Sequence, residues 1–80
     1  MTEQKRHPME QIGLNPDMLA VKDFIRDYIK ENGYSPTLKE ICNGVGKKSE
    51  GNMSVMIHKM VERGHLLRPK GTSRSVVVID

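Results

Sequence analysis

The sequence predicts a single α+β domain that is mainly helical, with three helices followed by a two-stranded β-hairpin. Apolar residues recur at helical spacing in three separate segments, and each segment starts at a residue suited to capping a helix. A valine-rich segment follows a turn near the C-terminus. At 80 residues the chain can bury only about 60% of the surface that it exposes when unfolded, so we expect one modest core.

The first helix is predicted to begin after Asn15. Asn15 suits the N-cap, and Pro16 suits the first helical position. Gly33 can take the left-handed conformation that ends a helix, and Pro36 disfavours a restart at the residue before it. One apolar face follows from the helical spacing of Met18, Val21, Ile25, Tyr28 and Ile29.

The second helix is predicted from the sequence Thr37-Leu38-Lys39-Glu40, which matches a capping box. In that motif the threonine hydroxyl accepts from the amide three residues later, and the glutamate accepts from the threonine amide. Gly44 and Gly46 are expected to mark the end of this helix and the turn that follows it. The apolar face comprises Leu38, Ile41, Cys42 and Val45.

The third helix is predicted to begin at Ser49 as N-cap, with Glu50 in its first turn, and to close at Gly64 after Arg63. Gly51 in the first turn costs up to about 1 kcal/mol against alanine, and it either frays this turn or permits close approach of a partner. The apolar face comprises Met53, Met56, Ile57, Met60 and Val61.

A hairpin is predicted after the third helix. Residues 65–68 form one expected strand, residues 69–74 a turn rich in Pro, Gly, Thr and Ser, and residues 75–79 a second, valine-rich strand. Some of Leu66, Leu67, Val76 and Val78 should face the helices. Three helices followed by a two-stranded hairpin define the winged helix-turn-helix architecture, in which the hairpin is the wing.

Residues 1–13 are predicted to be a flexible N-terminal arm, and residues 14–80 the folded domain. No apolar run reaches the roughly 18 residues of a membrane span, and the N-terminus has no apolar signal-peptide core. We therefore expect a cytoplasmic, nucleoid-associated protein that does not contact membranes. A single cysteine, Cys42, excludes an internal disulfide.

The positive charge is concentrated in the C-terminal half. Residues 47–74 contain seven Lys and Arg and two Glu, which gives +5, whereas the whole chain carries +3. Such a segment is typical of a surface that faces nucleic-acid phosphates. The alternative is an ordinary solvated surface.

The sequence gives little support to an enzymatic function. His7, His58 and His65 are not at metal-ligand spacing, and no carboxylate group accompanies them. Cys42 lies on an apolar helical face, so we interpret it as a core residue, and Gly44-x-Gly46 lacks the lysine of a phosphate loop. We predict no catalytic residue, metal site, cofactor or small-molecule substrate.

The chain resembles the DNA-binding domain of the LexA repressor. The resemblance runs without gaps from about residue 14 to residue 79. It is carried by residues 24–29 (FIRDYI), Gly33, Pro36-Thr37, Glu40-Ile41, Gly46, Ser49, Gly64 and Gly71-x-Ser73-Arg74.

This resemblance implies a transcriptional repressor. The helix over residues 49–63 would lie in the major groove, and the wing would touch the DNA backbone. Full-length members of the family carry a C-terminal serine-lysine peptidase domain that dimerises and cuts the linker. Because this sequence ends at Asp80, we expect no self-cleavage. Gly51, Asn52, Ser54 and Val55 depart from the family pattern, so we do not expect the damage-response operator of that family to be the target.

We predict two sets of contacts with double-stranded DNA. Asn52 is the best base reader because asparagine can bond adenine through two hydrogen bonds, and Val55 could pack on a thymine methyl group. A solvated or capping role for Asn52 is the alternative. The predicted base contacts are Ser49, Gly51, Asn52, Ser54 and Val55. The predicted backbone contacts are Thr37, Lys47, Lys48, Lys59, Lys70, Thr72, Ser73 and Arg74.

A monomer of this size should bury only about 600–1,000 Å² on DNA, which favours a homodimer or a protein partner. The alternative function is a protein-protein interaction module on the same scaffold, since the third helix is poor in arginine.

Overall fold

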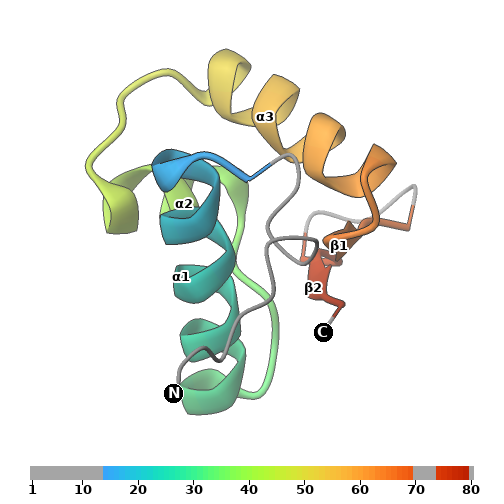
Figure 1. Ribbon diagram of the computed structural model, residues 1–80. Coiled ribbons are helices and arrows are strands. Elements are labelled where there is room, and N and C mark those ends of the chain that lie inside the picture. The colour runs from blue at the N-terminus through green and yellow to red at the C-terminus, as the bar shows by residue number, and fades with distance from the viewer. Residues whose placement is uncertain (1–13, 70–73, 80) are drawn as a thin grey trace, which may run out of the picture.

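The structure is a computed structural model that describes residues 14–69 and 74–79. Its elements are α1 (Pro16–Asn32), α2 (Leu38–Val45), α3 (Glu50–Glu62), β1 (Leu66–Leu67) and β2 (Val77–Val78). Figure 1 shows α3 along one edge of the molecule, with α1 running away from it and the hairpin beneath its C-terminal end. The predicted fold class, three helices and a two-stranded antiparallel hairpin, is confirmed.

The three helix starts use the caps that the sequence indicated. The Asn15 side chain accepts a hydrogen bond from the Met18 amide at 2.8 Å, and the Ser49 hydroxyl accepts from the Asn52 amide at 3.1 Å. Both halves of the Thr37–Glu40 capping box are present. Each cap contributes on the order of 1 kcal/mol, so the helix boundaries are fixed locally by these side chains.

The core lies between the three helices and one face of the hairpin. Its buried hydrophobic residues are Met18, Val21 and Ile25 of α1, Ile41 and Cys42 of α2, Met53, Ile57 and Met60 of α3, and Leu66 and Val76 of the hairpin region. Tyr28 and Ile29 of the expected α1 face are only partly buried. Three of the core residues are methionine or cysteine side chains on α2 and α3, which adapt to irregular space.

The hairpin is shorter than predicted. Among the described residues only Leu66 with Val78 and Leu67 with Val77 pair as strand residues, and the Ile79 amide extends the pairing by one hydrogen bond of 3.0 Å to the His65 carbonyl. Leu66 is buried, whereas Leu67 is 52% exposed. Strand propensity alone therefore overestimated the length of both strands.

Gly44 lies in the last turn of α2, one residue before its end at Val45. The C-terminal turn belongs to Gly46, which has a left-handed φ of 76°. A Cβ atom at Gly44 would lie 2.1 to 2.6 Å from three atoms of the Phe24 ring. Gly44 therefore allows α1 and α2 to pack closely through the Phe24 side chain.

Candidate nucleic-acid interface

α2 and α3 are joined by a short turn that fixes the start of α3. Gly46 ends α2 in the left-handed conformation, and the Lys47 amide donates to the Cys42 carbonyl at 2.9 Å. The Cys42 thiol in turn donates to the Ser49 carbonyl at 3.7 Å. Burial raises the pKa of this thiol, so Cys42 stays neutral and links the two helices. The arrangement is a helix-turn-helix.

α3 has one buried and one exposed face. Met53, Ile57 and Met60 point into the core. The exposed face carries Gly51, Asn52 and Val55, and Val55 is 56% exposed. Ser54 is half-buried at the edge of this face. An outward, polar N-terminal half is the part of a recognition helix that reaches base edges.

The predicted base contacts come together in the first turns of α3. The Ser49 oxygen caps the helix, which leaves its hydroxyl proton able to donate outward. The Asn52 side-chain amide has no hydrogen-bond partner among the described residues. At Gly51 an added Cβ would meet only the Ser49 oxygen, at 3.9 Å, so the fold does not require glycine there.

Lys47 and Lys48 lie at the N-terminal end of α3, and Lys59 lies in its last turn. Lys47 pairs with Asp17 at 3.2 Å, but both side chains are about half exposed, and such pairs contribute little. Lys48 and Lys59 have no ion-pair partner among the described residues. The surface is hollowed beside the first turn of α3, where Lys47 and Lys48 border a floor formed by Met53 and Met56.

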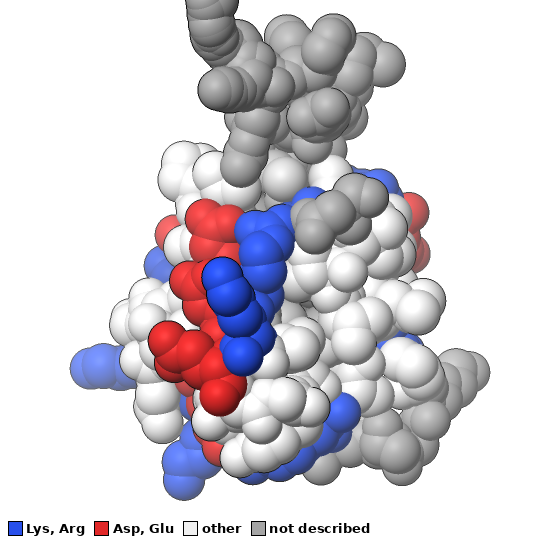
Figure 2. Space-filling model, turned by 90° about the horizontal axis from the view of Figure 1, so that it is seen from below, with Lys and Arg blue, Asp and Glu red and all other residues white. Residues whose placement is uncertain are grey.

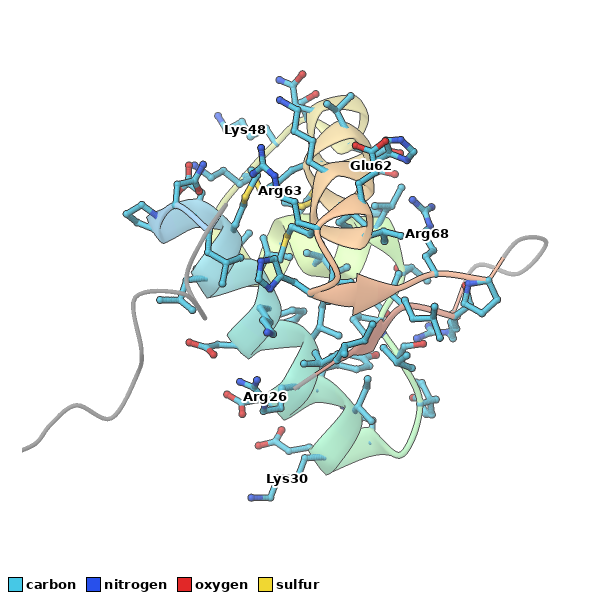
Figure 3. The ribbon with its side chains drawn as sticks, turned by 45° about the vertical axis from the view of Figure 1, so that its right-hand side comes forward. Arg26, Lys30, Lys48, Glu62, Arg63 and Arg68 are labelled. Carbon is cyan, nitrogen blue, oxygen red and sulfur yellow. The ribbon has the colours of Figure 1, made fainter. Side chains whose placement is uncertain are left out.

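Arg68 is a further candidate for contact with DNA that the sequence analysis did not single out. Figure 3 shows Lys48 beside the start of α3 and Arg68 just beyond β1, on the other side of that helix. Arg68 is partly exposed and forms no ion pair with another described residue. The charge of the segment 47–74 was the signal that could have indicated it, since Arg68 is one of its seven basic residues.

Arg74 has a structural role that the sequence did not indicate. Its guanidinium donates to the two carboxylate oxygens of Glu40 at 2.9 and 3.0 Å and to the Ser35 carbonyl at 3.1 Å. It also lies 4.9 Å from the centre of the Tyr34 ring. Because its charge is paired with Glu40, Arg74 is a weaker candidate for a phosphate ligand than the unpaired lysines, and its predicted backbone contact stays a prediction.

The Arg74 ion pair dominates the electrostatics of Glu40. The hydrogen bond from Arg74, followed by that from the Thr37 amide, lowers the pKa of Glu40 from its ordinary 4.5 to about 2. The same contact raises the pKa of Arg74. In the capping box the Thr37 amide donates to Glu40, and the Thr37 hydroxyl oxygen accepts from the Glu40 amide. The hydroxyl proton is left to contact DNA. The remaining predicted backbone contacts, Lys70, Thr72 and Ser73, lie outside the described residues.

The opposite side of the molecule has a different charge pattern. Figure 2 shows that acidic and basic side chains lie side by side on the face turned away from α3. α1 carries exposed charges of both signs there, and Asp23 pairs with Arg26 at 3.0 Å. Mixed charge of this kind does not attract a polyanion, so the face of α3 is the better nucleic-acid interface.

Within the described residues, no helix is long and apolar enough to cross a bilayer. No group of three or more His, Cys, Asp or Glu in that part of the chain is placed to hold a metal ion.

The helix-turn-helix and the hairpin packed behind it define a winged helix-turn-helix, a class of DNA-binding domain. A family model described as the LexA DNA binding domain matches residues 12–75. The chain therefore belongs to the family of LexA DNA-binding domains.

Curated relatives agree with this assignment. The chain is 34% identical to a LexA repressor of Clostridium kluyveri over all of its 80 residues, which are 35% of that relative. It is 30% identical to a LexA repressor of Moorella thermoacetica over 86% of this chain and 34% of the relative. It is 36% identical to a LexA repressor of Carboxydothermus hydrogenoformans over 70% of this chain and 28% of the relative. The chain thus spans about a third of the length of these relatives.

Proposed function

We propose that this protein binds double-stranded DNA at specific sequences and represses transcription by covering a promoter. The observation that carries the proposal is the face of α3, where polar side chains at the helix start are exposed beside Lys47 and Lys48. The relatives, which are named repressors, support the direction of regulation. Nothing in this function needs a catalytic group.

In the proposed complex α3 lies in the major groove with its N-terminal half against the bases. Ser49, Gly51, Asn52, Ser54 and Val55 face the base edges. Thr37, Lys47, Lys48, Lys59 and Arg68 contact the phosphates, and Lys70, Thr72 and Ser73 are proposed to do so from the wing. Since one domain buries only about 600–1,000 Å² on DNA, we propose that two copies occupy a two-fold symmetric site.

The test is a selection from a random duplex library with the purified 80-residue chain at moderate salt. We expect an enriched motif, and Asn52→Ala should bind it more weakly or relax it at one position. Asn32→Ala is the matched control, because Asn32 ends α1 far from α3. If no sequence is enriched and Asn52→Ala binds DNA as the parent does, the proposal is wrong.

A protein-interaction module is the second candidate, and the outer face of the hairpin favours it. Leu67 and Val77 stand opposite each other in the ladder and are 52% and 39% exposed, and Ile79 is 41% exposed. Recovery of a stoichiometric protein partner that is lost in Leu67→Ser, together with no DNA binding, would support this function over the first. Binding of DNA depends steeply on salt, whereas an apolar protein interface does not.

A further inference from the structure

The reading face of α3 carries side chains suited to adenine and thymine. No arginine or lysine lies between Lys48 and Lys59. Arginine and lysine are the usual readers of guanine, because they donate to both of its major-groove acceptors. Lys59 lies seven residues after Asn52, about 10 Å further along the helix axis, where side chains reach phosphates. Among the base contacts predicted within the helix, Asn52 and Val55 are the two exposed side chains, since Gly51 has no side chain and Ser54 is half-buried.

Asn52 is exposed and its amide is unpaired among the described residues. The side chain offers one donor group and one acceptor. Adenine matches both, with N7 as acceptor and N6 as donor, whereas guanine offers two acceptors and would leave the asparagine carbonyl without a partner. Among the bases, adenine is therefore the best hydrogen-bond partner for the Asn52 side chain.

Val55 is an apolar side chain that is 56% exposed on an otherwise polar face. The thymine methyl is the apolar group that a major-groove edge presents. Val55 lies one helical turn after Asn52, a rise of about 4.5 Å, which is close to the roughly 3.4 Å spacing of stacked base pairs. The two side chains can therefore reach neighbouring base pairs.

We infer that α3 reads two consecutive A·T base pairs, with Asn52 on the adenine of one and Val55 against the thymine methyl group of the next. This inference rests on the proposed function and names the DNA sequence that it would select. Glu50 precedes Asn52 in the first turn of α3. An ionised carboxylate can only accept hydrogen bonds, and among the bases cytosine offers a matching donor, its amino group. Gly51 leaves the backbone beside Asn52 open to the DNA.

The test uses the duplex enriched by selection, with single atoms of its bases removed. Replacing thymines one at a time by deoxyuridine deletes the 5-methyl group, and one position should weaken binding about fourfold, the effect of one buried methyl group. Val55→Ala should bind this uracil duplex and its thymine parent equally. Replacing one adenine by 7-deazaadenine should weaken the parent protein at least about fivefold but leave Asn52→Ala unaffected.

Leu67→Ala is the matched control for Val55→Ala, since Leu67 is similarly exposed at 52% but lies on the hairpin. It should keep the full sensitivity to uracil. The inference is overturned if no thymine shows this sensitivity, if Val55→Ala keeps it, or if the base pairs assigned to the two side chains are G·C. Failure to enrich any sequence would contradict the proposed function itself, so the two failures are distinguishable.

Discussion

Arg74 and Glu40 form a two-pronged ion pair, with the guanidinium nitrogens 2.9 and 3.0 Å from the carboxylate oxygens. The two residues are 34 positions apart in the chain, so this contact joins the segment before β2 to the first turn of α2. Glu40 accepts from the Thr37 amide at the same time. The pair therefore orients the hairpin relative to the helix-turn-helix, which sets the geometry of any interface that uses both.

Glu40→Gln should lower the melting temperature. Glutamine keeps the carbonyl oxygen that completes the capping box, but it loses the charge that holds Arg74. Thermal unfolding followed by circular dichroism at neutral pH measures the change. Asp23→Asn, which removes the same charge from the exposed pair with Arg26, is the control and should have little effect. Equal melting temperatures for the parent and Glu40→Gln would show that the pair does not hold the hairpin.

The contribution of this pair should depend on pH in the acidic range. The pKa of Glu40 is lowered to about 2 in the folded protein from an ordinary 4.5, so the folded state favours the ionised form. The resulting stability is fully present above about pH 4.5 and is lost as the pH falls toward 2. The difference in melting temperature between the parent and Glu40→Gln should therefore shrink over that window. A difference that stays constant from neutral pH to pH 2 would exclude ionic pairing as its cause.

The caps, the helical faces and the hairpin could be predicted because each depends on residues close in sequence. The Asn15, Thr37 and Ser49 caps are local signals of this kind. The pairing of Arg74 with Glu40 could not be predicted, because the two residues are far apart in the sequence. From the sequence alone, an arginine beside the wing is equally suited to bind a DNA phosphate. Which α3 side chains face outward followed from helical spacing, but the bases they meet remain a prediction.

Gly44→Ala should destabilise the protein, although alanine is the better helix former by about 1 kcal/mol. The added methyl would lie within 2.6 Å of three Phe24 ring atoms, and overpacking of this kind costs about 1–3 kcal/mol. Gly51→Ala is the matched comparison, since its methyl would meet only the Ser49 hydroxyl oxygen, at an ordinary contact distance of 3.9 Å. We expect Gly51→Ala to be neutral or stabilising by up to about 1 kcal/mol in urea unfolding.

Phe24→Leu in the Gly44→Ala background separates a clash from other effects. A smaller side chain should make the alanine less costly, so the two substitutions should be less destabilising together than the sum of their separate effects. Simple additivity would instead show that the Phe24 ring moves aside without cost.

Gly51→Ala also tests the interface, because its methyl lies beside Asn52 and should weaken DNA binding while the fold stays intact.

Binding to DNA should weaken steeply with salt, and Lys48 should account for one unit of that dependence. If Lys47, Lys48, Lys59, Arg68 and Lys70 together neutralise about five phosphates, log affinity per bound copy should fall against log salt with a slope near −4.5. Lys48→Ala should make the slope shallower by about 0.9, because one released counterion is lost. Lys30→Ala removes the same charge from the far part of α1, well away from α3, and should leave the slope unchanged. Fluorescence anisotropy with a labelled duplex over a range of salt concentrations measures both slopes. Identical slopes for the two variants would mean that the cations beside α3 do not face the phosphates.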